Sequence, residues 1–342
     1  MPLSRDEVVR AYKVVLGREP ESDFAIDHMR GRALDVYDAV AGLLNSPEYK
    51  SKIDYYPSYS SSDLAILARY AIQSEPSDGF ITDFLGNKTD ISFIKNISHL
   101  SGTVEGLPVP SNFHAEAIEW IGTLKAVDGA GQQFAVAEIG AGWGPWLVAA
   151  GSAARKLGKT VFMAGVEADP GHFESLRRHL GNNGFDPADH RLLLAAIGLA
   201  DGWAFFPRID SALDWGAAAV FQTSDTPPTH DYRSHAMSYD RVRAVSLESA
   251  LGDRQVFDLL HIDIQGSERE LIPAALDTLN RKVRWIVLGT HSRAIEGEMI
   301  ETLGTDWTLE HEKPCRFRPD GERIGPRQTV LDGAQVWRNR KF

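Results

Sequence analysis

The stretch 134–146 constrains the fold of this chain more than any other. Residues 134–139 are mostly apolar, as in a strand that is covered on both faces of a parallel sheet. Gly140, Gly142 and Gly144 then allow a sharp turn and a close approach of the backbone to a ligand, and Pro145 suits the first turn of a following helix. A dinucleotide-binding G-x-G-x-x-G motif would place its last glycine at the position of Pro145. The spacing therefore favours a nucleoside methyl donor over NAD.

Strand and helix patterns alternate from residue 134 onward, which is typical of an α/β fold with a doubly wound, mostly parallel sheet. Strands are predicted over 134–139, 161–167, 191–197, 256–263 and 283–290, with helices that begin near Pro145, Pro170, Ser267 and Ile295. An extra strand is predicted over 202–207 and a terminal antiparallel hairpin from 307–312 and 328–337. Residues 211–239 form a long polar loop, and a loop of that length is usually functional or disordered.

The length of 342 residues allows one large α/β domain and a smaller one. Apolar positions near the N-terminus recur at three- and four-residue steps, which predicts a small all-α module over 1–60. Residues 61–130 are predicted to be a connector of helices and loops that covers the ligand site, including a helix capped by Asn112. Residues 131–342 then form the α/β domain.

The composition argues against several classes of protein. A net charge of −11 disfavours broad binding to nucleic acids or anionic membranes. Cys315 is the only cysteine, so no intrachain disulfide can form, which suits a reducing compartment. The N-terminus has no apolar signal-peptide core, and no 18-residue apolar run is present. We therefore expect a cytoplasmic protein without a transmembrane segment.

Two acids end the second predicted strand. Glu167 follows the glycine turn at about the distance at which nucleotide-binding α/β folds place an acid on ribose hydroxyls. Either Glu167 or Asp169 can instead cap the next helix, and we assign the cap to Asp169 and the ribose to Glu167. The small residues around Ala196 leave a slot for an adenine ring, or are ordinary packing. Trp146 is expected to pack beneath the preceding helix, whereas Trp143 can pack, wall off the ligand or stack on a sugar.

The fourth predicted strand is apolar, yet it carries His261 and Asp263 and is followed by Gln265. Alternation places these three on one face, and because an unpaired buried charge is costly, that face must meet a partner, a metal or water. His291 ends the adjacent strand and is expected to face Asp263 and His261 across one crevice. Coincidental polar residues in the core are the alternative. His230, Tyr232 and Arg233 lie in the long loop, which is either a lid over an acceptor or a solvated insertion.

Six segments combine into one recognisable pattern. They are Glu138–Gly144, Val166–Pro170, Asn182–Gly184, Ala196–Gly198, Val245–Glu248 and Leu260–Glu268. Together they resemble the class I S-adenosylmethionine-dependent methyltransferases, and the FkbM family in particular, over residues 136 to about 314. Two features depart from the family: many members have Lys at His261 and Glu at Gln265. Related metal-dependent sugar methyltransferases carry acids where this chain has Thr290 and His291.

The resemblance implies a Rossmann-like fold that binds S-adenosyl-L-methionine and methylates a hydroxyl, commonly on a sugar of a surface polysaccharide or natural product. The implied cofactor residues are Glu138, Gly140, Gly142, Gly144, Glu167, Ala168, Ala196 and Asp263. Either His291 or His261 would remove the hydroxyl proton, and Asp263 would orient that base or bind the acceptor. The acceptor residues would be His230, Tyr232, Arg233 and Gln265. A divalent metal on Asp263, His261 and His291 is a less favoured route, and these ligands suit Zn, Mn or Fe better than Mg.

The N-terminal segments 11–20 and 43–49 resemble a small helical module of phycobilisome linkers and of some polysaccharide-related enzymes. We therefore expect an interaction role there, with a protein partner. Three other functions remain open: a catalytically inactive α/β domain that binds glycans or partners, a methyltransferase acting on a non-sugar small molecule, and, disfavoured by the glycine spacing, a nucleotide-dependent oxidoreductase.

Overall fold

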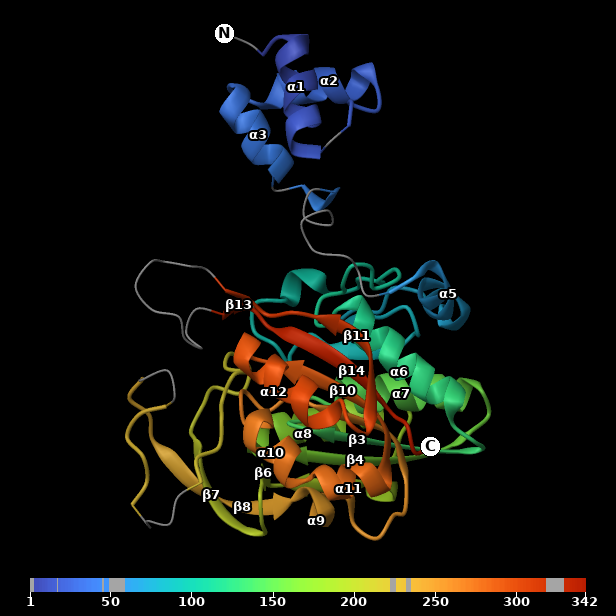
Figure 1. Ribbon diagram of the computed structural model, residues 1–342, viewed down its shortest axis with the longest axis vertical. Coiled ribbons are helices and arrows are strands. Elements are labelled where there is room, and N and C mark those ends of the chain that lie inside the picture. Colours follow the sequence, from blue (N-terminus) through green and yellow to red (C-terminus); the bar gives the residue numbers. More distant parts are fainter. Residues whose placement is uncertain are drawn as a thin grey trace. The chain divides into compact units, whose positions relative to one another are not determined.

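The computed structural model (Figure 1) describes residues 3–16, 18–44, 46–48, 59–221, 226–231, 235–317 and 329–342. The chain divides into two compact units, Met1–Pro57 and Ser58–Phe342. Tyr232 and Arg233, which the sequence suggested as acceptor-binding residues, lie outside the described residues.

The first unit is helical and has its own core. Its helices are α1 (Arg5–Leu16), α2 (Asp23–Arg32) and α3 (Val36–Leu44). Each helix contributes side chains to a single apolar cluster, for example Val8, Ile26 and Leu43. The three- and four-residue apolar spacing of the sequence therefore becomes one buried face per helix.

The second unit is built on a seven-stranded sheet in the order β11-β14-β10-β9-β3-β4-β5. The strands are β3 (Gln133–Ile139), β4 (Thr160–Glu167), β5 (Arg191–Leu194), β9 (Phe257–Ile262), β10 (Val283–Thr290), β11 (Trp307–Lys313) and β14 (Gly333–Asn339). Strands β10, β9, β3, β4 and β5 run parallel, whereas β14 is antiparallel to both β10 and β11. The mostly parallel sheet, the terminal hairpin and the adjacency of β9 and β10 are confirmed.

Helices cover both faces of this sheet (Figure 1). Phe134 and Val136 of β3 pack into the core that includes α6 (Ala117–Gly129), α7 (Pro145–Lys156) and α8 (Pro170–Asn182). The alternate residues Ala135 and Ala137 pack into a second core with the remaining helices. These helices are α9 (Leu247–Leu251), α10 (Glu268–Ala274), α11 (Leu276–Lys282) and α12 (Arg293–Leu303). The sheet is thus doubly wound, as predicted.

Residues 59–130 belong to the same unit as the sheet. They contain α5 (Ser61–Tyr70), β1 (Phe80–Thr82), β2 (Lys88–Asp90), a short 3-10 helix η1 (Ser98–Leu100) and α6. Leu67 and Phe84 pack into the same core as α6 and α7. The prediction that Asn112 caps the last helix is wrong, because α6 begins at Ala117 and its cap residue is Glu116. Asn112 instead accepts a hydrogen bond from the backbone N–H of Ala115 in the preceding turn.

The third predicted strand divides into two. Its second part, β6 (Ala196–Gly198), leaves the main sheet and pairs with β8 (Tyr239–Ser246), which also pairs with β7 (Gly202–Pro207). The extra strand at 202–207 is confirmed, whereas β8 was not predicted. The remaining short elements are η2 (Pro187–Asp189), β12 (Arg316–Phe317) and β13 (Thr329–Leu331). Across the described ranges, no helix is both long and apolar enough to cross a bilayer.

Candidate active site

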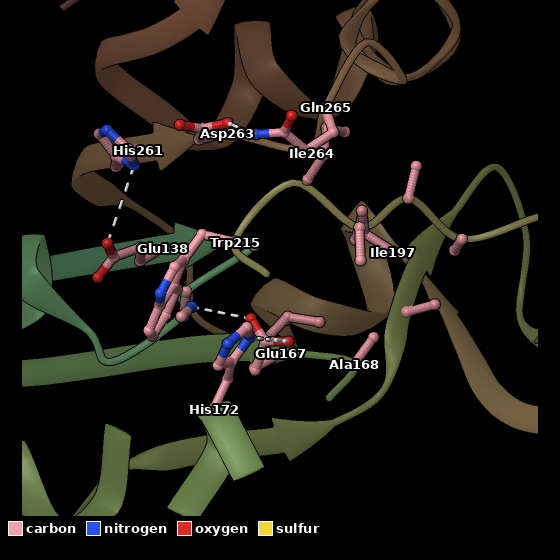
Figure 2. A pocket seen from close by; sticks show the side chains of 18 of the residues that line it. Glu138, Glu167, Ala168, His172, Ile197, Trp215, His261, Asp263, Ile264 and Gln265 are labelled. Carbon is pink, nitrogen blue, oxygen red and sulfur yellow. Dashed lines mark hydrogen bonds and ion pairs between the residues drawn. The ribbon is translucent and has the colours of Figure 1, made fainter. Parts of the chain in front are cut away.

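A cavity of about 290 Å³ opens at the carboxyl ends of β3, β4 and β9, the edge at which open α/β sheets bind ligands. Its lining includes Glu138, Gly140, Gly142, Glu167, Ala168, Ala196, His261 and Asp263, whereas the predicted cofactor residue Gly144 is not part of the lining. Figure 2 shows several of these side chains around one hollow. Most of the predicted cofactor residues therefore lie around one space.

The glycine turn is pressed against its neighbours. Gly140 has φ of +72°, and a Cβ there would lie 2.0 Å from the carbonyl oxygen of Asp263. Gly142 has φ of +55° and lies against the Trp215 ring. A Cβ at Gly142 would lie 3.3 Å from the nearest ring atom of Trp215. Only glycine combines this backbone conformation with so close an approach. The turn after β3 is thereby packed directly against the end of β9.

Glu138 caps a helix from the strand beneath it. Its carboxylate accepts hydrogen bonds from the backbone N–H of Trp146 at 3.4 Å and of Leu147 at 3.0 Å. Residue Gly144, at the cap position of α7, has no side chain for this task. Burial, together with the nearby Asp263 and Glu167 carboxylates, raises the pKa of Glu138 well above its usual value. Glu138 is therefore a structural part of the turn as well as a residue of the cavity wall.

Glu167 is fixed by the turn that it faces. It accepts hydrogen bonds from the backbone N–H of Gly142 at 2.8 Å and of Asp169 at 2.7 Å. Asp169 accepts from the N–H of His172 at 2.8 Å and caps α8, which confirms the predicted cap. A carboxylate held in this way can still accept hydrogen bonds from ligand hydroxyls. Ala168 and Ala196 continue this wall with apolar surface, together with Ile197 and Phe206.

Aromatic side chains form the rest of the wall. Trp146 packs against Trp120 of α6, with ring centroids 4.9 Å apart, so its predicted packing beneath the preceding helix is confirmed. Trp143 meets Trp215 edge to face at 4.7 Å. Trp215 comes from the long loop and stacks on His172 at 3.9 Å (Figure 2). Trp215 was not among the predicted site residues, although a tryptophan in a polar loop was an available signal.

His261 lies deeper in the sheet than predicted. It is buried, stacks on Trp146 at 5.1 Å, and lies 3.8 Å from a Glu119 oxygen and 3.9 Å from a Glu138 oxygen. Both of its ring nitrogens lack a hydrogen-bond partner in the described structure. The expectation that His261 faces His291 is wrong, because β9 and β10 pair His261 with Val287 and His291 lies beyond the end of β10. The predicted metal ligand set that includes His261 is likewise not brought together.

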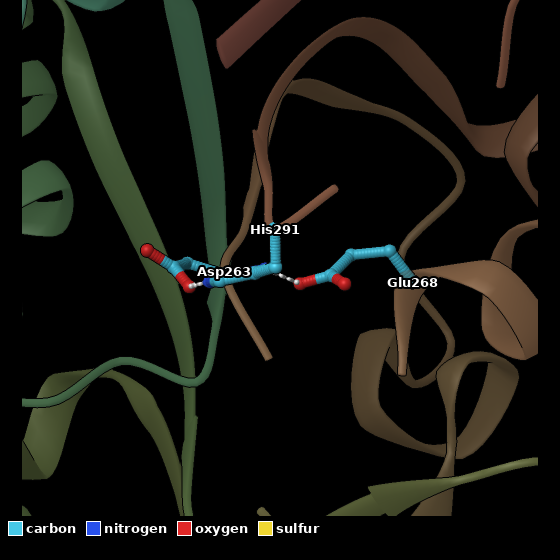
Figure 3. Close-up of side chains that lie close together, drawn as sticks. All are labelled: Asp263, Glu268 and His291. Carbon is cyan, nitrogen blue, oxygen red and sulfur yellow. Dashed lines mark ion pairs between the residues drawn. The ribbon is translucent and has the colours of Figure 1, made fainter. Parts of the chain in front are cut away.

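His291 is clamped between two carboxylates (Figure 3). Its Nε2 lies 3.1 Å from Asp263 Oδ1, as predicted, and its Nδ1 lies 3.1 Å from Glu268 Oε1. Burial alone would lower the pKa of His291, but Asp263 and Glu268 raise it to about 11. Burial also opposes ionisation of Asp263, yet the hydrogen bond with His291 lowers the pKa of Asp263. An imidazolium cannot accept a proton, so this arrangement does not suit His291 as a general base at neutral pH.

Glu268 was not among the predicted site residues. It is fully buried at the start of α10 and accepts a hydrogen bond from the N–H of Ile264 at 2.8 Å. Ligand-type atoms of Asp263, Glu268 and His291 all lie within 4.8 Å of one another. The third member of this cluster is therefore Glu268, and not His261 as predicted.

A second cavity of about 720 Å³ adjoins the first. Gln265 and Ser267 line both cavities, and the second is also lined by Arg269, His291 and Asp332. His230, a predicted acceptor residue, is exposed and lines neither cavity, whereas His235 of the same loop lines the second. Of the predicted acceptor residues that the structure describes, Gln265 is at the site and His230 is not.

Comparisons with known proteins identify relatives of this chain. Residues 135–312 match the family described as "Methyltransferase FkbM domain". A protein of Jannaschia sp. (strain CCS1) with the name "Putative methyltransferase" is 32% identical over 266 residues, which are 77% of this chain and 93% of that protein. Among solved structures, the ribosomal protein L11 methylase of Lactobacillus delbrueckii subsp. bulgaricus is 12% identical, with a TM-score of 0.33, over 66% of this chain and 81% of its own. A precorrin-6y C5,15-methyltransferase of Geobacter metallireducens GS-15 is 10% identical, with a TM-score of 0.36, over 66% of this chain and 89% of its own.

Proposed function

Because the chain belongs to the FkbM methyltransferase family, we propose that it moves a methyl group from S-adenosyl-L-methionine to a sugar hydroxyl. The observation that carries this proposal is the pair of adjoining cavities, which share Gln265 and Ser267. One offers a glycine turn and acids to a nucleoside, and the other offers polar side chains to a second molecule. The acceptor we favour is a bacterial surface polysaccharide or glycoconjugate precursor, methylated in the cytoplasm.

The first cavity fits such a donor. S-adenosylmethionine supplies, when bound, an electrophilic methyl group on a positively charged sulfur. Glu167, fixed by backbone N–H groups of the turn, is placed to accept hydrogen bonds from ribose hydroxyls. Ala168 and Ala196 provide apolar surface for a planar base. The carboxylates of Glu167 and Asp263 give this cavity the negative charge that suits a cationic ligand.

The second cavity fits a molecule with many hydroxyls. Arg269, Ser292 and Thr329 bring hydrogen-bond donors to its wall, and Asp332 brings an acceptor. Few of its lining residues are large and apolar, so a lipid or an aromatic acceptor would leave these polar groups unpaired. This polarity supports a sugar over a non-sugar aromatic acceptor.

Asp263 is our candidate for the group that receives the acceptor proton. It lines the first cavity and contacts His291, which lines the second, so it stands at the junction. A hydroxyl oxygen becomes strongly acidic as it gains a methyl group, so an ionised carboxylate is a sufficient base. His291, held from behind by Glu268, keeps the Asp263 carboxylate in place. His291 is thus a positioning residue in this proposal.

A divalent metal is not required by this arrangement. If one binds, Asp263, Glu268 and His291 would hold it, and it would polarise the acceptor hydroxyl. Both nitrogens of His291 already face carboxylates, so the cluster compensates its own charge. Dialysis against EDTA is expected to leave the methyl-transfer rate within about twofold of its starting value. Loss of a metal that contributes about 1.4 kcal/mol to the reaction would instead lower the rate about tenfold.

The test combines binding with chemistry on the glycan. S-adenosylhomocysteine should bind the purified protein in calorimetry, and mass spectrometry should show a methyl group missing from the surface polysaccharide of a strain that lacks the gene. Return of the wild-type gene should restore the methyl group, and return of Asp263→Asn should not. Absence of nucleoside binding would reject the proposal. Binding with an unchanged polysaccharide would favour an inactive binding domain or a small-molecule acceptor.

The helical unit has a separate proposed role. With its own core, it is suited to docking the enzyme to a protein partner of the polysaccharide assembly. Side chains such as Phe24 and Tyr37 are largely exposed on it and are available for such a contact.

A further inference from the structure

The first cavity is rich in acidic side chains. Among the described residues that line it, Glu119, Glu138, Glu167 and Asp263 are acidic, and none is lysine or arginine. The amino-acid end of an S-adenosyl donor carries an ammonium group and a carboxylate. The acids suit the ammonium group, but the carboxylate requires hydrogen-bond donors of its own.

His114 provides one such donor, and Asn112 fixes which ring nitrogen carries the proton. The Asn112 side-chain oxygen accepts from the N–H of Ala115 at 2.9 Å and from Trp120 Nε1 at 3.4 Å, which sets the orientation of the amide. Its NH₂ group then lies 3.3 Å from His114 Nδ1 and donates to it. Burial lowers the pKa of His114 to about 3, so the ring is neutral and its single proton is on Nε2. His114 Nε2 is buried without a partner and its residue lines the cavity.

Trp143 provides a second donor beside it. Its indole Nε1 is also buried without a hydrogen-bond acceptor in the described structure, and its ring centroid lies 5.9 Å from that of His114. Trp215, 4.7 Å from Trp143, has an unpaired buried Nε1 as well. Buried N–H groups without partners are rare in folded proteins, and here they gather in the wall of one cavity.

We infer that His114 Nε2–H and Trp143 Nε1–H form a neutral anion site for the α-carboxylate of the donor. A lysine or arginine at this place would pair with the surrounding acids, whereas a neutral N–H group stays available. Glu119, which lines the same cavity and lies 3.8 Å from His261 Nε2, is placed for the ammonium group. The inference rests on the proposed use of an S-adenosyl donor and adds the groups that recognise its amino-acid end.

Calorimetry with two probes tests this site without any methyl transfer. S-adenosylhomocysteine has the carboxylate, and its decarboxylated form, S-adenosyl-3-thiopropylamine, lacks only that group. The wild-type protein should bind the first about tenfold or more tightly than the second. His114→Phe keeps a ring but removes the N–H, and Trp143→Phe does the same for the indole. Each should weaken S-adenosylhomocysteine about tenfold and change the decarboxylated probe less than about twofold, with His114→Gln partly restoring affinity.

Several results would overturn the inference. If the wild-type protein binds the two probes with equal affinity, the carboxylate is not recognised. This test needs no variant. Unchanged affinity for S-adenosylhomocysteine in both variants would remove His114 and Trp143 from the site. Equal losses for both probes would assign the two residues to packing. If the wild-type protein binds neither probe, the proposed function itself fails, which distinguishes that outcome from the others.

Discussion

At the scale of single residues, His291 ties two carboxylates together that would otherwise repel each other. Glu268 is fully buried, and the His291 side chain is 12% exposed. Removal of the cation therefore leaves a buried charge without its partner, which is among the most destabilising changes in a protein.

We expect His291→Leu to lower the free energy of unfolding by about 2 kcal/mol, because the second carboxylate, Asp263, is partly exposed and is screened by water. Urea denaturation measures this loss. The matched control is the same substitution in a Glu268→Gln background, where only the partly exposed Asp263 charge loses its partner and the loss should be at least halved. Equal losses in both backgrounds would contradict the ion-pair role.

A second residue-scale prediction concerns acid stability. Burial lowers the pKa of His179 from 6.5 to about 4, and that of His114 to about 3. Below pH 6.5 the unfolded chain binds protons at these rings and the folded chain does not, so stability falls as the pH drops from 6.5 toward 4. Each ring contributes a slope of up to about 1.4 kcal/mol per pH unit.

His179→Gln should therefore flatten the fall of unfolding free energy between pH 6.5 and 4, although it lowers stability at pH 7. Urea denaturation at a series of pH values measures the slope. A variant with the wild-type slope would show that His179 is protonated equally in both states.

Residue identity and spacing predicted part of the site. Glu167, Asp263 and His291 could be placed from strand ends, because parallel strands bring their carboxyl ends to one edge. Glu268 and His114 could not be placed in this way. Glu268 reaches His291 only through the conformation of the 264–267 turn, and His114 reaches the cavity from a loop that precedes α6. The conformations of this turn and this loop do not follow from any periodic pattern in the sequence.

At the scale of elements, the turn after β3 is defined by how closely it approaches β9. Gly140 and Gly158 have nearly the same backbone conformation, with φ of +72° and +73°, but a Cβ at Gly158 would meet nothing within 4 Å. The pair therefore separates the cost of the backbone conformation from the cost of the contact.

Gly158→Ala should cost about 1 kcal/mol of stability, which reflects the left-handed conformation alone, and should leave nucleoside binding intact. Gly140→Ala should cost clearly more and abolish binding of S-adenosylhomocysteine, because the new Cβ collides with the Asp263 carbonyl. Thermal unfolding and calorimetry on both variants measure the difference. Similar behaviour of the two would mean that the turn adapts without its contact to β9.

Helices and strands could be predicted where the apolar residues keep one periodicity over the whole element. Buried strands β3, β4, β9 and β10 and the helices after them follow continuous apolar patterns of sufficient length. The division into β5 and β6 was not predictable, because the run 191–197 is continuous in sequence and only its partners change, from β4 to β8. Local sequence does not determine which neighbour a short strand pairs with.

At the scale of the whole molecule, the binding groups and the helical unit are separable. The lining residues of both cavities belong to Ser58–Phe342, and the first unit has a core of its own. A domain with its own core can fold independently.

A chain of residues 58–342 should therefore bind S-adenosylhomocysteine with an affinity within about twofold of that of the full chain. Lost contacts worth about 1.4 kcal/mol would instead weaken the affinity about tenfold. Calorimetry on both chains measures this. The shortened chain should nevertheless restore polysaccharide methylation poorly in the strain that lacks the gene, if the helical unit docks a partner. A large loss of affinity in the shortened chain would place the helical unit in donor binding.

The contact between Gly140 and the Asp263 carbonyl has a consequence for the diversity of such enzymes. In the proposed reaction, this contact joins the donor side to Asp263, the proposed proton acceptor, through main chain alone, so the separation of the reacting groups does not depend on the surrounding side chains. The second cavity, which we propose for the acceptor, is in contrast partly walled by loop residues such as Ala219 and His235. New acceptors are therefore within reach of loop exchange, with the transfer geometry inherited unchanged.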